Sequence, residues 1–70
     1  MHRAPVTSTC LSSVGYDSKS QLLELEFESG GIYQYSDVPA HVHDELMDAE
    51  SKGRFFLSAI RGEFYYERVG

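Results

Sequence analysis

Seventy residues form one small domain, close to the size below which chains need disulfides or metals to fold, and they leave no room for a deep cleft. A hydrophobic fraction of 41% excludes general disorder, and no apolar run approaches the ~20 residues that span a bilayer. The net charge of −5 argues against a protein that coats nucleic acid, and the single cysteine, Cys10, excludes an internal disulfide, so we expect a reduced, cytosolic protein.

The first ordered segment is expected to follow a short N-terminal tail. Residues 1–5 show no structural period, so we expect them to be disordered and residues 6–70 to form a single domain. The run TCLSSVGYD, residues 9–17, then places Cys10, Val14 and Tyr16 at even positions and closes on a Gly, Asp and Ser cluster typical of a turn. This run predicts a β-strand.

A second strand is predicted where leucine and glutamate alternate. In LLELEFE, residues 22–28, Leu23, Leu25 and Phe27 share one face, and the glutamates share the other. Glu24 and Glu26 would lie about 7 Å apart on that face, a separation that suits acid–base chemistry. Because no pocket is predicted beside them, we favour a solvated strand face.

The stretch ESGGIYQYSDVP, residues 28–39, is expected to return as the second arm of a hairpin. The length of its loop decides where two tyrosines point, because a slip of one residue exchanges the faces of a strand. A two-residue loop would pair Phe27 with Ile32. Tyr33 and Tyr35 would then lie on the glutamate face as exposed rings open to a ligand.

A three-residue loop that ends at Gly31 would use this glycine as the left-handed residue of a bulge. It would pair Phe27 with Tyr33. Leu25 would then face Tyr35, and both tyrosines would point into the core. We favour this arrangement because it gives the bulkier and more apolar inward set.

A helix is predicted over VPAHVHDELMDAESKG, residues 38–53. Its apolar residues, such as Val42 and Leu46, recur at helical spacing. Pro39 suits the first helical position, and Gly53 suits a left-handed stop.

A second, shorter helix and a closing strand complete the chain. In RFFLSAIR, residues 54–61, Phe56 and Ile60 fall on one helical face, and Gly62 is expected to end it. The aromatic run EFYYERV, residues 63–69, predicts a closing strand or an extended tail. The order is then β-β-β-α-α-β, an antiparallel sheet with two short helices packed on one face, which is the α+β class.

Few residues suggest catalysis or metal binding. His2, His41 and His43 are too few for a metal site, and positions 41 and 43 of a helix point roughly 200° apart; we expect the two helix histidines to be solvated. Cys10 lacks a CxxC partner and is expected to be a half-buried packing residue. The chain has no Gly-x-Ser-x-Gly elbow and no phosphate-binding loop. We therefore predict a protein without catalytic residues, metal or other cofactor.

The charge is unevenly distributed along the chain. Residues 1–50 hold two basic residues against nine acids, a net charge of −7, whereas residues 51–70 hold four basic residues against two acids, a net charge of +2. This last part interleaves cations with rings that can stack on bases. The candidate nucleic-acid-binding residues are Lys52, Arg54, Arg61, Arg68, Tyr65 and Tyr66. The competing interpretation places one of Phe55 and Phe56, and one of the two tyrosines, in the core and leaves the arginines as ordinary solvated surface.

The ordered set of short motifs resembles the KTSC domain family over nearly the whole chain after residue 5. The matching motifs are V-x-S-T-x-L-x-x-V-G-Y-D (residues 6–17), L-x-L-x-F (23–27), G-x-Y-x-Y (31–35), VP (38–39), A-x-S-K-G (49–53) and FF-x-x-x-I (55–60). Tyr33 and Tyr35 match the Tyr-x-Tyr hallmark of the family. Leu57 departs from it, since an asparagine often follows the aromatic pair, and Thr9 stands where a second serine is common.

The resemblance implies a role without locating a site. KTSC domains occur alone in bacterial proteins and at the C-terminus of some lysyl-tRNA synthetases, which implies RNA as a partner. We therefore expect a non-enzymatic binding module for RNA. A protein-binding module is the alternative, which the negative charge favours, and a small enzyme is the least favoured class.

Overall fold

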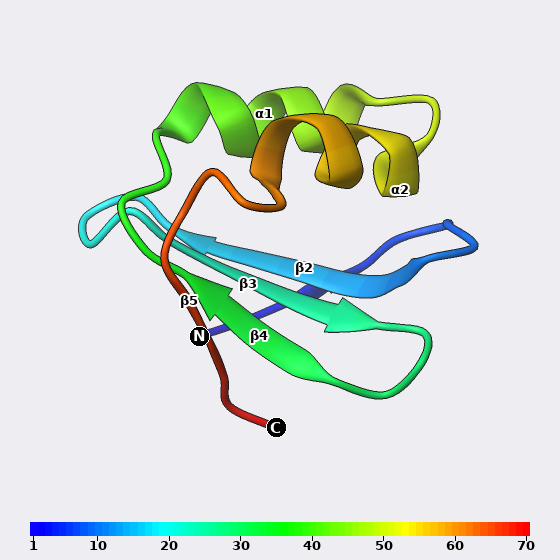
Figure 1. Ribbon diagram of the computed structural model, residues 1–70, viewed down its shortest axis with the longest axis horizontal. Helices are drawn as coiled ribbons and strands as arrows, with labels where there is room; N and C mark the ends of the chain where they lie inside the picture. Colours follow the sequence, from blue (N-terminus) through cyan, green and yellow to red (C-terminus); the bar gives the residue numbers. More distant parts are fainter.

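The computed structural model describes all residues from 1 to 70 and arranges them in two layers, an antiparallel sheet and a layer of helices on one of its faces (Figure 1). Five strands pair in chain order, each antiparallel to its neighbour. The elements are β1 (Ala4–Pro5), β2 (Leu11–Asp17), β3 (Leu22–Phe27), β4 (Ile32–Tyr35), α1 (Ala40–Asp48), α2 (Lys52–Phe55), the π-helical turn η1 (Phe56–Ile60) and β5 (Tyr66–Arg68). The predicted α+β class is confirmed, with one strand more than the sequence predicts.

The additional strand lies in the N-terminal segment, where we expect disorder over residues 1–5. Instead, Ala4 and Pro5 pair with β2, and Arg3 reaches across the sheet to Glu24 of β3. Backbone pairing with β2 and the contacts of the Arg3 side chain therefore hold this segment against partners far along the sequence. The periodicity of the local sequence does not indicate contacts of this kind.

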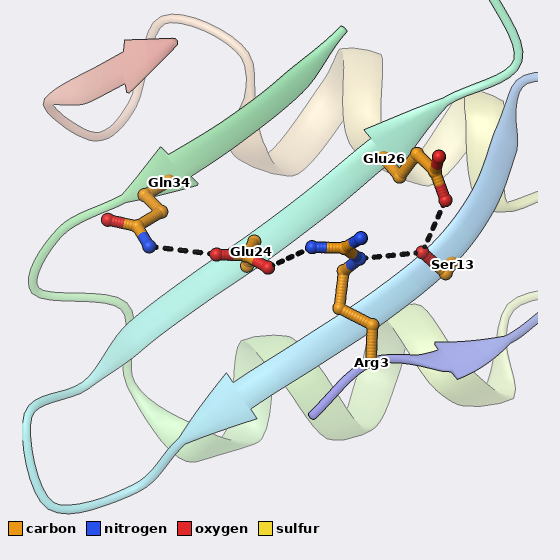
Figure 2. Close-up of polar contacts among 5 residues, drawn as sticks. All are labelled: Arg3, Ser13, Glu24, Glu26 and Gln34. Atoms are coloured by element: carbon orange, nitrogen blue, oxygen red, sulfur yellow. Dashed lines mark hydrogen bonds and ion pairs between the residues drawn. The ribbon is translucent and has the colours of Figure 1, made fainter. Parts of the chain in front are cut away.

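Strand β3 forms as its alternating pattern predicts. Leu23 and Leu25 are fully buried under the helices, while Glu24 and Glu26 point to the opposite side of the sheet, which we call the open face (Figure 2). Val14 of β2 lies opposite Leu25 and is also buried, so the two central strands contribute to the same core.

The hairpin between β3 and β4 has the predicted three-residue loop and glycine bulge, but both lie one residue earlier in the chain. The amide of Gly30 donates to the carbonyl of Phe27 at 2.9 Å, and the amide of Phe27 donates to the carbonyl of Gly31 at 2.9 Å. The loop is therefore residues 28–30. Gly30, with a φ of 112°, is the left-handed residue in place of Gly31.

This loop shifts the predicted pairing by two residues. Leu25 lies opposite Tyr33, and Leu23 lies opposite Tyr35. The predicted pairs of Phe27 with Tyr33 and Leu25 with Tyr35 do not form. Because an even shift keeps each side chain on its face, both tyrosines still point toward the helices. Tyr35 is 4% exposed, and Tyr33 is half-buried.

Helix α1 buries Val42 and Leu46, the positions expected from helical spacing. Pro39 is its N-cap and not its first helical residue as predicted, so the helix begins one residue later, at Ala40. The backbone is extended at Ala49, which ends α1 at Asp48, and α2 begins at Lys52. Helix α1 is therefore shorter than predicted.

The predicted stop of this helix at Gly53 is wrong, because Gly53 lies inside α2. The free carbonyls at the end of α1 are capped by a side chain instead. The amino group of Lys52 donates to the carbonyl oxygens of Met47 and Ala49 at 3.1 and 3.2 Å. A cation at the C-terminal end of a helix also opposes its dipole favourably.

Phe56 and Ile60 are buried, as predicted, but they belong to a wider turn than an α-helix. The amide of Arg61 donates to the carbonyl of Phe56 at 2.9 Å, a bond that spans five residues. Gly62, with a φ of 79°, then ends the turn at the predicted residue.

Ten buried hydrophobic residues form one core between the sheet and the helices. They are Leu11, Val14, Leu23, Leu25, Tyr35, Val38, Val42, Leu46, Phe56 and Ile60. Cys10 packs at the edge of this core and is half-buried, as expected. No helix has the length and the apolar character needed to cross a membrane.

Candidate functional site

A hollow of about 360 Å³ is bordered by the β3–β4 hairpin, by β4 and β5, and by the turn η1 with the two residues that follow it. Five aromatic rings and two arginines line it, and we call it the aromatic hollow. Its lining residues are Phe27, Ser29, Gly31, Tyr33, Tyr35, Phe56, Arg61, Gly62, Tyr66 and Arg68. Both tyrosines of the Tyr-x-Tyr motif are among them.

The strand pairing brings the tyrosines of the hollow together. Tyr33 and Tyr35 alternate on β4, and Tyr66 of β5 lies opposite Tyr35. Gly31 leaves room for the ring of Tyr33, since a Cβ at this position would lie 2.7 Å from Tyr33 Cε1. The glycine and the tyrosines of the G-x-Y-x-Y motif therefore act together to shape one side of the hollow.

The five rings form a continuous cluster. Centroids lie 5.5 Å apart for Phe27 and Tyr33, 5.2 Å for Phe27 and Phe56, 5.8 Å for Tyr35 and Phe56, 5.6 Å for Tyr35 and Tyr66, and 5.9 Å for Tyr33 and Tyr66. Such spacings are those of attractive edge-to-face and offset contacts. Tyr66 is the exposed member of the cluster, at 53%, so its ring has a surface open to solvent.

The two arginines of the hollow are positioned by different means. The backbone hydrogen bond that closes η1 joins the amide of Arg61 to the carbonyl of Phe56. One wide turn therefore places both an aromatic ring and a cation at the hollow. Turns of this kind recur at functional sites. The guanidinium carbon of Arg68 lies 5.9 Å from the ring centroid of Tyr33, and its Nε donates to the carbonyl of Gly70 at 2.8 Å.

The hollow is positive and contains no carboxylate. None of the eleven acidic residues lines it, and neither Arg61 nor Arg68 forms an ion pair. Burial, with the nearby Tyr66 and Tyr33, raises the pKa of Tyr35 to about 12, against the opposing effect of Arg61. Tyr35 is therefore neutral at physiological pH.

The tyrosine hydroxyl groups in the hollow have no partner within the chain. Tyr33, Tyr35 and Tyr66 make no side-chain hydrogen bond, and no buried polar side-chain atom in the structure lacks a partner, so these hydroxyls keep access to solvent. Together with the two guanidinium groups they give the hollow free hydrogen-bonding capacity above its rings.

Three of the six candidate nucleic-acid-binding residues, Arg61, Arg68 and Tyr66, meet in the hollow. The other three lie elsewhere. Lys52 caps α1, and the exposed Arg54 lies on α2. Tyr65 is exposed, and its hydroxyl donates to Glu67 at 3.0 Å, which raises the pKa of Tyr65.

The competing interpretation of this region is correct for one ring and wrong for another. Phe56 is in the core, but neither Tyr65 nor Tyr66 is buried. Sequence reasoning did not assign Phe27 and Phe56 to the site. Their inward positions follow from strand and helix periodicity, but these patterns do not indicate that the two rings meet.

The open face carries a second polar cluster, which we call the Arg3 network (Figure 2). Arg3 pairs with Glu24 and donates from Nε to Ser13 at 2.9 Å. Ser13 donates in turn to Glu26 at 2.9 Å, and Gln34 donates to Glu24 at 2.8 Å. Every member is therefore bonded to another.

The expectation that Glu24 lies on a solvated strand face is wrong. Glu24 is 6% exposed, because the Arg3 side chain reaches over the open face to it from the edge strand and Gln34 contacts it from β4 (Figure 2). Burial by itself raises the pKa of Glu24, but hydrogen bonds from Gln34 and Arg3 and the positive charge of Arg3 outweigh it, so the pKa lies below its ordinary value. A carboxylate held in this way is a poor proton acceptor.

The helix histidines differ in their surroundings. His41 is exposed and lies 3.2 Å from the carboxylate of Glu45, the one His–Glu pair that the spacing allows. His43 is not solvated as expected, because its ring stacks on Tyr16 with centroids 4.8 Å apart. No three His, Cys, Asp or Glu side chains lie together as a metal site would require.

Comparison with known proteins identifies close relatives of the chain. The family model described as the KTSC domain matches residues 7–65. An uncharacterized protein of Stutzerimonas stutzeri is 42% identical over 70 residues, which are 99% of each chain. The crystal structure of a KTSC domain protein from Yersinia pestis is 43% identical, with a TM-score of 0.96 over 99% of this chain and 97% of that one.

Similar segments also occur within larger proteins. A lysine–tRNA ligase of Trichormus variabilis is 46% identical over 54 residues, which are 77% of this chain and 10% of the ligase. A ligase of the same name from a Nostoc species is 48% identical over a segment of the same length. The likeness therefore concerns a small part of each ligase.

Proposed function

The chain belongs to the KTSC domain family, and from that premise we propose that it is a non-enzymatic binding module whose aromatic hollow binds single-stranded RNA. The observation that carries the proposal is the composition of the hollow, five rings with two arginines and no carboxylate, in a chain of net charge −5. Rings stack on bases whatever their sequence, and arginines contact phosphates. The free thiol of Cys10 is compatible with the reducing cytoplasm as its location.

The distribution of charge supports this use of the hollow. On the open face the Arg3 network pairs its one cation with the carboxylate of Glu24, whereas Arg61 and Arg68 have no acidic partner. An anionic ligand would meet two cations there without displacing a carboxylate. Similarity to a segment of lysine–tRNA ligases, whose name places tRNA among their substrates, agrees with an RNA partner.

The test is fluorescence anisotropy of a labelled single-stranded oligoribonucleotide, from low to physiological salt. We expect weak binding, because two phosphate contacts at about −0.7 each give a salt slope of only about −1.4. The double variant R61Q/R68Q should lose this binding.

A control variant of equal net charge is K19Q/R54Q, since both residues are exposed and neither lines the hollow. It should bind almost as the parent does. Absence of binding at low salt, or full binding by R61Q/R68Q, would contradict the proposal and leave a protein partner as the better interpretation. Equal losses in both double variants would mean that net charge, and not the hollow, determines binding.

A further inference from the structure

The size and charge of the aromatic hollow limit what part of an RNA it can hold. A volume of about 360 Å³ is near the lower end of the ~300–1,000 Å³ range of small-molecule sites. It accommodates one nucleotide and not a run of them. We propose, building on the function proposed above, that the hollow holds the terminal nucleotide of an RNA that ends in a phosphate monoester, with its base on Tyr66 and its phosphate on Arg61 and Arg68.

Tyr66 is the ring most available to a base. The ring of Tyr35 is covered by Phe56 on one side and by Tyr66 on another, and the ring of Tyr33 is contacted by Phe27 and Arg68. Tyr66 is 53% exposed and makes no side-chain hydrogen bond. A base can therefore stack on it without displacing any packed side chain.

The two arginines fit a terminal phosphate better than an internal one. The single bond of the Arg68 side chain to protein uses Nε, which leaves both terminal nitrogens free. Arg61 makes no side-chain bond at all and lines the same hollow. A phosphate monoester carries about −1.5 to −2 charges at neutral pH, whereas an internal phosphodiester carries one. Two unpaired guanidinium groups, each able to bind two oxygens, match the monoester in charge and in number of donors.

The surroundings do not offer a competing anion. The hollow lacks Asp and Glu, and the hydroxyls of Tyr33 and Tyr35 remain free to donate to further phosphate or ribose oxygens. An unphosphorylated end would leave one of the two arginines without a partner. The chemistry thus favours phosphorylated ends over internal segments of the same strand.

The first experiment uses the smallest ligand. Adenosine 5′-monophosphate is titrated into the ¹⁵N-labelled protein, with adenosine and inorganic phosphate in parallel. We expect amide shifts confined to residues of the hollow, and affinity about tenfold or more weaker for each half of the ligand alone. Inorganic phosphate binding as tightly as the nucleotide would overturn the base contact, and adenosine binding as tightly would overturn the phosphate contact.

The second experiment compares one oligoribonucleotide with a 5′-phosphate, a 3′-phosphate or neither, by competition anisotropy. We expect one of the phosphorylated forms to bind about tenfold more tightly than the unphosphorylated strand. R61Q and R68Q should each abolish this preference, while R54Q keeps it. Tyr66→Ala should weaken all three strands by about fivefold or more, and Tyr66→Phe should not, because stacking needs the ring alone.

These measurements separate failure of this inference from failure of the proposed function. Equal binding of all three strands would overturn the terminal-phosphate site while leaving RNA binding intact. If no strand binds but the mononucleotide still binds through Arg61 and Arg68, the site is correct and RNA is the wrong partner. If neither the nucleotide nor any strand binds, both proposals fail.

Discussion

The two faces of the sheet use charged side chains in opposite ways. On the open face, Arg3 and Glu24 are bonded to each other and to their neighbours, and Glu24 is almost fully buried. In the aromatic hollow, Arg61 and Arg68 have no carboxylate partner and remain exposed. Charges that are paired within the chain stabilise it, whereas cations held apart from the acids are free for a ligand. The comparison therefore separates charges that the fold pairs from charges that it leaves unpaired, in a chain that is acidic as a whole.

Both faces depend on the same two strands. On β3, leucines alternate with glutamates, and on β4, Tyr33 and Tyr35 alternate with Ile32 and Gln34. A slip of β4 by one residue would put the tyrosines on the open face and Ile32 and Gln34 under the helices. The hairpin loop that sets this register therefore determines both the hollow and the Arg3 network.

The largest effect should come from removing the most buried ring of the hollow. We expect Tyr35→Ala to destabilise the protein by about 3 kcal/mol, because it truncates a large side chain in the core. Tyr33→Ala should cost less, about 1 to 2 kcal/mol, since Tyr33 is only half-buried. Urea unfolding followed by circular dichroism measures both values.

A matched control for this pair is Leu25→Ala, which truncates a fully buried residue on the same face outside the hollow. It should fall in the same range as Tyr35→Ala. A loss below about 1 kcal/mol for Tyr35→Ala would mean that its ring is not a core element, and the tyrosines would then be better regarded as an exposed platform.

The sequence predicts those parts of the fold that repeat locally. The alternation of Leu23 and Leu25 with glutamates gives β3 and its inward face, and Gly62 marks the end of the second helical segment. The hairpin is predicted in kind but not in position, because Gly30 and Gly31 are adjacent and either can supply the left-handed residue. Both tyrosines still point inward, as predicted, because the predicted strand pairing is wrong by two residues, an even number.

The candidate site is less predictable because it depends on contacts between distant residues. Arg61, Arg68 and Tyr66 are found from composition, but Phe27 joins them only through the fold. The wide turn η1 has no local signature that separates it from an α-helix. The sequence predicts Lys52 as a phosphate contact, and its role as a helix cap becomes visible only when the end of α1 is known.

On the open face, the next largest effect should follow removal of Arg3. We expect Arg3→Met to cost about 2 kcal/mol, because it leaves the carboxylate of Glu24 buried without its cation. The value is below that for a fully buried pair, since the Arg3 side chain is 27% exposed and water can replace part of it. Adding Glu24→Gln to this variant should recover part of the loss.

Urea unfolding of the parent, both single variants and the double variant gives the coupling between the two residues. A coupling near zero would show that the network contributes no more than an exposed ion pair. The paired charges of the open face would then not stabilise the protein, and this part of the contrast between the two faces would be wrong.

The pH dependence of stability sharpens the same comparison with a smaller effect. Because the pKa of Glu24 is lowered from its ordinary value of 4.5, its carboxylate stabilises the folded protein fully above about pH 4.5. This contribution is lost as the pH falls below 4.5 and through the pKa in the folded state. Glu24→Gln should therefore flatten the fall in stability over that acidic window, measured by urea unfolding at a series of pH values. Glu50→Gln, which removes an exposed carboxylate, is the control for loss of one charge, and equal curves for the two variants would contradict the assignment to Glu24.

The smallest effect on stability should come from Tyr66, and it separates folding from binding within the hollow. Its side chain is 53% exposed, and its ring contacts only the rings of Tyr33 and Tyr35. Tyr66→Ala should therefore destabilise the protein by less than about 1 kcal/mol. The same change should markedly weaken RNA binding, because it removes the open stacking surface. Tyr65→Ala is a matched control, since Tyr65 is also exposed but does not line the hollow. Thermal unfolding and anisotropy on the same preparations test this, and a Tyr66→Ala variant that keeps full affinity, or loses no more than Tyr65→Ala, would show that the exposed ring is ordinary surface.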